Sequence, residues 1–266
     1  MKILCTVKFV PDVDKFKYDF ENNTVVRKNI RMIINPEDAN AIAFALKMKA
    51  KFPEMLVEAV TMGPKSIMPL VEDLVRVGVD KVTVITDKCF LGSDSYATSK
   101  VLGAFIKEET FDCILTGTHS IDGDTSHVPS QLAEILDISQ MSNVVRIDED
   151  RFNEESVVFT VDSEIKESIY EMKMPGVISL NKDSKYKMPY IKYEDLNKDV
   201  KDKINIISNS ELDLMENEVG VKGSLTKVNR TFVKEYKKRA KNIVKNDEEG
   251  IGFVFKFLKD NGYIKE

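Results

Sequence analysis

Long hydrophobic runs, paired cysteines and an excess of basic residues are all absent from this sequence. No stretch approaches the roughly 20 apolar residues that span a bilayer, and the first residues lead into a strand-like segment rather than a signal peptide. Cys5, Cys89 and Cys113 lie far apart in or beside apolar runs, which is typical of buried side chains in a reducing compartment. The formal net charge of -5 argues against nucleic acid as the main partner. We therefore expect a cytoplasmic protein that does not span a membrane and has neither a disulfide framework nor a CxxC metal site.

The sequence does contain enough apolar residues for a large core, 42% of 266. Short runs rich in β-branched residues alternate with helical patterns through the first half, which predicts a parallel sheet with right-handed crossovers. The predicted strands cover residues 3–10, 57–62, 81–86 and 113–117, and the predicted helices cover residues 36–50, 65–77, 95–108 and 126–136.

The second half follows a different pattern. Apolar and polar residues alternate over residues 156–161 and 168–172, which predicts antiparallel strands added at a sheet edge. Residues 174–180 then predict a last buried strand. Beyond a charged connection, a helix is expected near residues 231–245, with one apolar side and one basic side.

These patterns divide the chain into two parts. We expect a nucleotide-binding α/β domain over residues 1–200 and a C-terminal arm over residues 201–266. A helix with a single apolar stripe after a polar connection packs on a partner as readily as on its own core.

One helix start carries several chemical signals together. Asn35 offers a capping side chain, Pro36 suits the first helical position, and Glu37 and Asp38 place carboxylates against the positive end of the helix.

Small polar residues collect at the carboxyl ends of the predicted strands, where open parallel sheets bind their ligands. They occur over residues 6–11, 61–64 and 116–125. The last segment offers backbone N–H groups and a helix dipole to a phosphate. The simpler alternative is that Gly123, Asp124 and Thr125 form only a turn and a helix cap.

The longer context of this segment favours a ligand site. Residues 120–128, Ser-Ile-Asp-Gly-Asp-Thr-Ser-His-Val, precede a Leu-Ala-Glu helix. This resembles the beta-subunit signature of electron-transfer flavoproteins, in which A-I-D-G-D-T-x-Q-V precedes an L-A-E helix. His127 stands where that family usually has glutamine and keeps a hydrogen-bonding side chain. The resemblance continues in family order over nearly the whole chain, at residues 7–12, 34–39, 59–64, 92–99 and 220–228.

The resemblance implies a nucleotide site and no catalytic side chain. The implied site comprises Thr6, Lys8, Asn35, Pro36, Glu37, Asp38, Met62, Gly63, Gly117, Thr118, His119, Ser120, Ile121, Asp122, Gly123, Asp124 and Thr125. His119 and His127 lie in or beside this loop without a third metal ligand at suitable spacing, so no metal is assigned.

Two branches of the family differ in the nucleotide they bind. Housekeeping members hold AMP as a structural element, whereas electron-bifurcating members bind a second FAD whose adenylate half uses the same pocket. Residues 92–99 resemble the bifurcating branch, in which Ser93, Asp94, Tyr96 and Thr98 are expected as further contacts to FAD. NADH would then deliver hydride to that flavin, with the protein supplying orientation and electrostatics. The alternative is an ordinary helix cap by Ser93 or Asp94.

The resemblance also implies a fold and partners. The fold expected is α/β, a parallel-sheet, adenine-nucleotide α-hydrolase-like (Rossmann-like) core with added antiparallel edge strands and a C-terminal helical arm. The chain would pair with an alpha subunit and pass electrons to ferredoxin or flavodoxin and to a flavin dehydrogenase of the acyl-CoA or lactate type. Residues 186–191 match the family's recognition loop, in which Met188 would be the docking anchor. Packing of Met188 on the protein's own core is the alternative.

Other classes of protein stay open at this point. One is a non-bifurcating electron carrier that holds structural AMP. Another is a non-redox nucleotide-binding module of the universal-stress type, although its G-x-x-G-x(9)-G-[ST] loop is absent. A nucleotide-hydrolysing or adenylating enzyme would need a pyrophosphate loop of the S-G-G-x-D-S type near the first strand, where residues 10–13 are Val-Pro-Asp-Val.

Overall fold

The computed structural model describes residues 1–12, 18–19, 24–25, 31–163, 165–227 and 241–264. The chain divides into two compact units, Met1–Asn229 and Arg230–Glu266. The strands are β1 Lys2–Thr6, β2 Phe9–Pro11, β3 Tyr18–Asp19, β4 Thr24–Val25, β5 Met32–Ile34, β6 Leu56–Met62, β7 Lys81–Ile85, β8 Cys113–Gly117, β9 Ser139–Phe152, β10 Ser156–Asp162, β11 Glu167–Lys173, β12 Gly176–Leu180 and β13 Ile204–Ile207. The helices are α1 Pro36–Lys51, α2 Met68–Arg76, α3 Ser95–Lys107, α4 Val128–Leu136, α5 Asn209–Leu212, α6 Gly220–Gly223 and α7 Glu248–Asp260. Short 3-10 helices are η2 Lys65–Ile67, η3 Lys88–Phe90, η4 Lys182–Ser184, η5 Tyr193–Asp195 and η6 Lys201–Lys203.

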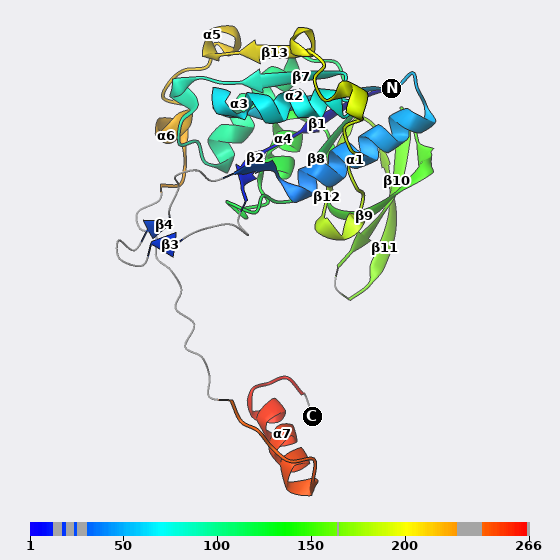
Figure 1. Ribbon diagram of the computed structural model, residues 1–266, viewed down its shortest axis with the longest axis vertical. Helices are drawn as coiled ribbons and strands as arrows, with labels where there is room; N and C mark the ends of the chain where they lie inside the picture. Colours follow the sequence, from blue (N-terminus) through cyan, green and yellow to red (C-terminus); the bar gives the residue numbers. More distant parts are fainter. Residues whose placement is uncertain (13–17, 20–23, 26–30, 164, 228–240, 265–266) are drawn as a thin grey trace. The chain divides into compact units, whose positions relative to one another are not determined.

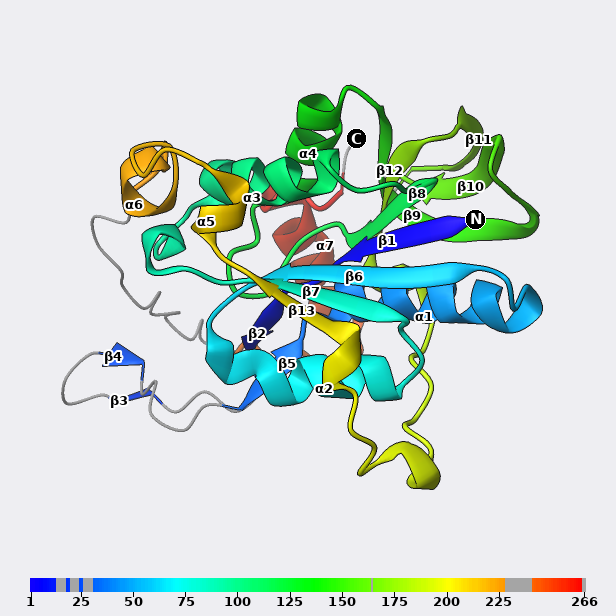
Figure 2. The ribbon, with the colours of Figure 1, turned by 90° about the horizontal axis from the view of Figure 1, so that it is seen from above.

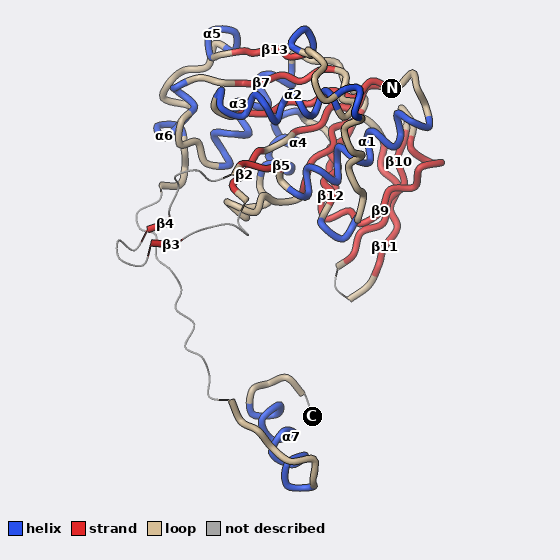
Figure 3. The backbone as a smooth tube through the Cα atoms, in the orientation of Figure 1, coloured by secondary structure: helices blue, strands red, loops and turns tan. Residues whose placement is uncertain are grey.

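The larger unit is an α/β fold around a 9-stranded sheet in the order β11-β10-β9-β12-β8-β1-β6-β7-β13 (Figure 1). Every neighbouring pair from β9 to β13 in this order is parallel. β10 pairs antiparallel with β9 and with β11, and the β10–β11 hairpin extends from the sheet edge (Figure 3). The predicted parallel core with antiparallel edge strands is therefore confirmed.

Apolar layers cover both faces of the sheet, because successive strand residues point to opposite sides. In β1, Ile3 and Cys5 pack in the core formed with α1 and α2, whereas Leu4 packs in the core formed with α3 and α4. Figure 2 shows the two helix pairs on opposite faces of the sheet. This sandwich fixes the carboxyl ends of the central strands along one edge.

The first predicted strand, residues 3–10, was wrong as a single element. β1 ends at Thr6, and after Lys8 the chain continues as β2, which pairs antiparallel with β5 outside the main sheet. The physical reason is that the Lys8 N–H donates to the Asp38 carboxylate at 2.7 Å instead of to a neighbouring strand. The other predicted strands and the four predicted helices of the first half are present, with shifted ends.

The larger unit extends beyond residue 200, where the sequence predicted a division. β13 lies in the predicted arm but pairs parallel with β7 as part of the main sheet, so β12 is not the last strand. Of the helix predicted near residues 231–245, residues 231–240 lie outside the described part, and residues 241–245 are not helical.

The smaller unit contains α7, a helix that the sequence analysis missed. Asp247 caps it by accepting a hydrogen bond from the Gly250 N–H, and Glu248 and Glu249 lie in its first turn. In the described part of the chain, no helix is both long enough and apolar enough to cross a membrane.

Candidate functional site

The candidate site lies at the carboxyl ends of β1 and β8. From β1 the chain proceeds outward to β6 and β7, and it then crosses back to form β8 and β12 on the other side of β1. Such a reversal of strand order leaves a crevice in which open α/β sheets bind ligands. The loop from β8 to α4, residues 118–127, lies at this point, and we call it the β8–α4 loop.

Asp38 holds the ends of β1 and β8 together. Its two carboxylate oxygens accept hydrogen bonds from the backbone N–H groups of Lys8, at 2.7 Å, and Gly117, at 2.8 Å. The close approach requires glycine, because a Cβ on residue 117 would lie 2.5 Å from Asp38 Oδ1 and 2.7 Å from Glu37 Cβ. The two strand ends therefore share one buried anchor in the first turn of α1.

Glu37, the residue before Asp38, anchors the loops that follow β8 and β12 in the same way. Its side chain is 2% exposed, and its oxygens accept from the N–H groups of His119 and Lys182, both at 2.9 Å. His119 Nδ1 also lies 3.0 Å from Glu37 Oε2, and its Nε2 lies 3.5 Å from Asp124 Oδ1. Two adjacent carboxylates of α1 thus fix loops that follow β1, β8 and β12.

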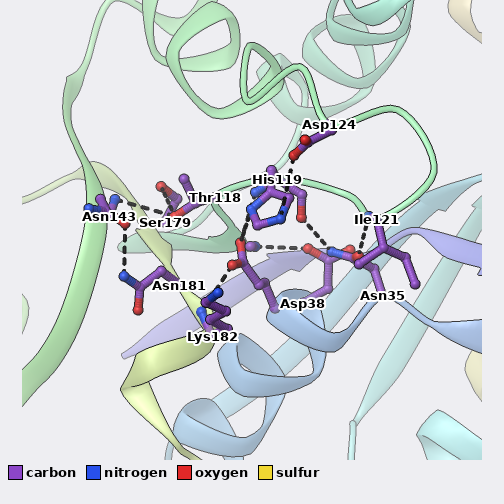
Figure 4. A network of polar contacts seen from close by, with 12 residues as sticks. Asn35, Asp38, Thr118, His119, Ile121, Asp124, Asn143, Ser179, Asn181 and Lys182 are labelled. Carbon is purple, nitrogen blue, oxygen red and sulfur yellow. Dashed lines mark hydrogen bonds and ion pairs between the residues drawn. The ribbon is translucent and has the colours of Figure 1, made fainter. Parts of the chain in front are cut away.

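Asn35 occupies the N-cap position of α1, yet its side chain makes no cap hydrogen bond. It faces the β8–α4 loop instead, donating to the His119 carbonyl at 2.8 Å and accepting from the Ile121 N–H at 3.2 Å (Figure 4). The predicted capping role was therefore wrong, because the amide satisfies both of these loop groups at once. The predicted position in the nucleotide site still places Asn35 against the loop.

Lys8 supplies the cationic group of the site. Its ammonium lies 2.7 Å from Asp122 Oδ1 and 3.2 Å from Ser120 Oγ, and its side chain is 48% exposed. Burial alone would raise the pKa of the Asp122 carboxyl, but the hydrogen bond and charge of Lys8 hold this pKa below its ordinary value. Asp122 is consequently ionised at neutral pH and braces the ammonium.

The end of the β8–α4 loop presents backbone donors. Asp124 and Ser126 have φ values of 49° and 56°, the left-handed region, on either side of Thr125. Among the described residues, the N–H groups of Thr125, Ser126 and His127 have no hydrogen-bond partner. Alternating backbone conformations of this kind turn successive N–H groups toward one side, as anion-binding nests do.

Four further predicted residues lie at or directly beside the ends of strands and at the start of α1. Thr6 is buried at the end of β1, and Pro36 is the first residue of α1. At the end of β6, Met62 packs on the core beneath α3, and the Gly63 N–H donates to the Ile85 carbonyl at 3.0 Å. These contacts support the edge of the sheet, and they include no hydrogen bond to the β8–α4 loop.

Ser93 and Asp94, predicted as further contacts to a flavin, form hydrogen bonds to the segment around α6. The Asp94 carboxylate caps α3 through the Ala97 N–H and also accepts from the N–H and hydroxyl of Thr226, at 2.8 and 2.9 Å. The Ser93 hydroxyl accepts from the Gly220 N–H at 3.2 Å. Asp94 therefore caps α3 and also holds a segment more than 100 residues away in sequence, and its contact to a flavin stays a prediction.

The remaining predicted residues lie on α3 and in the segment that follows β12. The Tyr96 ring lies 5.6 Å from the Lys100 ammonium, and the Thr98 N–H donates to the Asp94 carbonyl within the first turn of α3. Met188 is partly buried and packs against the main core, whereas the neighbouring Tyr190 is 97% exposed. Met188 thus packs in part on the protein's own core, and its role as a docking anchor stays a prediction.

Three polar residues of the site were not predicted from the sequence. Asn143, within β9, gathers with Ser179 and Asn181, at the end of β12, around Thr118 (Figure 4). They are distant in sequence and belong to no motif. One signal in the sequence was available, an asparagine within a strand pattern. Asparagine tolerates the left-handed backbone conformation, and Asn143 adopts it with a φ of 63°.

Burial raises the pKa of the Asp38 carboxyl to about 7, although hydrogen bonds from the Lys8 and Gly117 N–H groups lower it in part. In the unfolded chain this carboxyl ionises near its ordinary value of 3.8. Between these values the folded protein keeps a proton that the unfolded chain has lost, so the free energy of unfolding falls as the pH rises.

Asp38→Asn removes this titration. We therefore expect the wild type to lose stability relative to the variant as the pH rises from about 4 to about 7, because only the wild type ionises a buried carboxyl. Urea unfolding of both proteins across this range measures the difference. A difference that does not change with pH would contradict the prediction.

Comparison with known proteins places the chain in a family. The model of the electron transfer flavoprotein domain matches residues 22–185. The chain is 32% identical over 253 residues to an electron transfer flavoprotein subunit beta of Thermoanaerobacterium thermosaccharolyticum, which covers 94% of this chain and 95% of that protein. It is 30% identical over 233 residues to the caffeyl-CoA reductase-Etf complex subunit CarD of Acetobacterium woodii, with 87% of each covered.

A further relative matches about half of the chain. It is the acryloyl-CoA reductase electron transfer subunit gamma of Anaerotignum propionicum, 37% identical over 145 residues, which covers 53% of this chain and 54% of that protein. The family model covers more than half of the chain, and two relatives at 30% identity or more match at least 87% of it. The chain belongs to the electron transfer flavoprotein family, in which it is a beta subunit.

Proposed function

We propose that this chain, paired with an alpha subunit, holds the adenylate half of an FAD at the carboxyl ends of β1 and β8. The complex would take electrons from NADH and pass them by bifurcation to ferredoxin or flavodoxin and to a flavin dehydrogenase. The observation that carries the nucleotide assignment is the β8–α4 loop, whose N–H groups at residues 125–127 face no protein acceptor in the described structure.

The charges around this loop suit a phosphate. Lys8 contributes an ammonium that is half exposed, and α4 presents its positive end directly after the loop. Glu37 and Asp38 would repel an anion if they faced it, but both are buried and directed at backbone N–H groups. The donors of the loop therefore remain available while the nearest buried carboxylates are engaged elsewhere.

The side chains of this subunit would bind and orient rather than react. When bound, a flavin supplies the hydride and electron chemistry, which includes acceptance of hydride from NADH. Lys8 and the N–H groups of residues 125–127 would hold the phosphate, and Asn35 would keep the β8–α4 loop in place. No acid or base from this chain is required for that task.

The names of two relatives bear on the dehydrogenase. One belongs to a caffeyl-CoA reductase complex and the other to an acryloyl-CoA reductase. These names support a partner that acts on a CoA ester rather than on lactate. The docking segment proposed for it, residues 186–191, would present the exposed Tyr190 beside the partly buried Met188.

The smaller unit is proposed to pack on the alpha subunit. Ile251, Val254, Phe255 and Leu258 follow a helical spacing on α7 and line a groove of about 460 Å³ with residues 244–246. Ile251 and Phe255 are 61% and 57% exposed, which leaves a large apolar surface in water. The relatives are described as subunits of larger assemblies, so the alpha subunit is the proposed occupant.

The nucleotide content of the purified heterodimer tests the proposed function. We expect two FAD and no AMP, measured by absorbance and by chromatography of the nucleotides released on denaturation. One FAD and one AMP would support the non-bifurcating carrier instead. One FAD without any second adenine nucleotide would contradict the site itself.

Two lysines on β1 and just beyond it provide a matched pair of variants. Lys8→Met removes the ammonium beside the β8–α4 loop, so we expect it to lower the content of the second nucleotide. Lys2→Met removes the ammonium at the opposite end of β1, where it pairs with Glu58 and Glu109. Equal nucleotide loss in both variants would point to instability and against a phosphate contact.

A further inference from the structure

Asn143 connects three strand ends with the β8–α4 loop. Its backbone N–H donates to Thr118 Oγ1 at 3.3 Å, and its amide nitrogen donates to the Asp162 carbonyl, at the end of β10, at 2.9 Å. Its amide oxygen accepts from Asn181 Nδ2 at 2.8 Å, directly after β12. One exposed side chain thus joins β9, β10 and β12 beside the point where the loop leaves β8. Figure 4 shows Asn143 beside Thr118 and Asn181.

The backbone at Asn143 explains how these contacts arise. The residue has a φ of 63° beside shifts in strand register, between Ile178 and Leu180 of β12 and between Thr160 and Val161 of β10. Asparagine is one of the few side chains that tolerate this conformation. The extra residue turns the Asn143 N–H away from the ladder and toward Thr118.

A second series of contacts links Asn143 to His119, the residue after Thr118 in the loop. Asn181 is 8% exposed, and the next residue, Lys182, donates its N–H to Glu37, which also accepts from the His119 N–H. Asn143 therefore acts on Thr118 directly and on His119 through Asn181 and Glu37. The first two residues of the loop are held from the side of the antiparallel strands as well as from α1.

We propose that Asn143 is a positioning residue for nucleotide binding, which holds the start of the β8–α4 loop so that its N–H groups at residues 125–127 converge on the phosphate. This inference rests on the proposed nucleotide site. Asn143 itself would not touch the nucleotide. Its side chain fixes the backbone from which the N–H donates to Thr118, through the bonds to Asp162 and Asn181. Loss of this side chain would leave the bond to Thr118 less well fixed and speed dissociation, because part of the binding free energy would then be spent on ordering the loop.

The test compares two asparagines, Asn143 within β9 and Asn153 directly after it. Asn143→Gly keeps the left-handed backbone available and removes both side-chain contacts. Asn153→Gly is the control, because Asn153 also makes two side-chain hydrogen bonds, to the N–H groups of Glu155 and Ser156. Asn143→Asp keeps an acceptor for Asn181 and loses the donor to Asp162, so an intermediate effect is expected.

The measurement is the dissociation rate of radiolabelled AMP from nucleotide-depleted heterodimer, with the unfolding temperature recorded for each variant. We expect Asn143→Gly to release AMP about tenfold faster, since two hydrogen bonds are lost, and Asn153→Gly to match the wild type. Equal rates for the two glycine variants would overturn the inference. If the wild type binds no AMP, the proposed nucleotide site fails instead.

A second variant keeps the inference testable if Asn143→Gly does not fold. Asn181→Asp removes the donor to Asn143 and keeps the oxygen that accepts from the Asp183 N–H. Faster AMP release by this variant supports a positioning role for the network. A rate equal to that of the wild type would overturn it.

Discussion

Gly117→Ala should unfold at a temperature roughly 5–10 °C below that of the wild type, a loss of about 3 kcal/mol. The added Cβ would lie 2.5 Å from Asp38 Oδ1 and 2.8 Å from the Asp38 backbone nitrogen. Neither of these two atoms of Asp38 can move away from the added Cβ. The Asp38 carboxylate is held by the Lys8 and Gly117 N–H groups, and the Asp38 backbone belongs to α1. The same displacement should release the nucleotide.

Gly123→Ala is the matched control for this effect. A Cβ at residue 123 would lie 3.6 Å from Ser120 Oγ and 3.9 Å from Lys8 Nζ, which is ordinary contact. Its unfolding free energy should stay within about 0.5 kcal/mol of the wild type. Differential scanning calorimetry of the three proteins measures the contrast, and similar unfolding temperatures throughout would contradict the tight packing at Gly117.

The second large effect concerns the assembly of the two subunits. Replacing Ile251 and Phe255 together by aspartate should weaken association with the alpha subunit at least about 100-fold, because two apolar side chains are lost and two charges enter the proposed interface. Both residues line the groove on α7. Calorimetric titration of the purified alpha subunit with each form of this chain gives the affinity.

Lys256→Asp is the control on the same helix. Lys256 is exposed and does not line the groove, so its replacement should leave association within about threefold of the wild type. Circular dichroism would confirm that both variants keep their helix content. Unchanged affinity of the double aspartate variant would show that α7 does not contact the alpha subunit through this groove.

The sequence predicted the central fold because its signals are local. β-branched runs and helical spacing act over a few residues, and they located β6, β7, β8 and the helices between them. The resemblance of the loop segment likewise placed residues 117–125 at a strand end. Register shifts and long-range pairing follow from tertiary packing, so neither β13 nor the bend at Asn143 could be located in this way.

The same limit explains why the sequence did not indicate the long-range contacts of two N-cap residues. Asn35 and Asp94 both occupy helix N-caps, and local rules describe only the capping function. Asp94 caps α3 and also accepts hydrogen bonds from Thr226, whereas the Asn35 side chain makes no cap hydrogen bond and contacts the β8–α4 loop. Which of these contacts forms depends on the segment that the fold brings alongside, and that segment is far away in sequence.

Strand β13 has a consequence for how the chain folds during synthesis. It covers β7, whose edge would otherwise expose the backbone beside Val82, Val84 and Ile85. An uncovered apolar edge strand recruits strands of other molecules and starts aggregation. Because β13 is made more than 100 residues after β7, a ribosome-bound chain exposes this edge until residues 204–207 emerge. Chains interrupted before that point should therefore be the ones that aggregate and require chaperones.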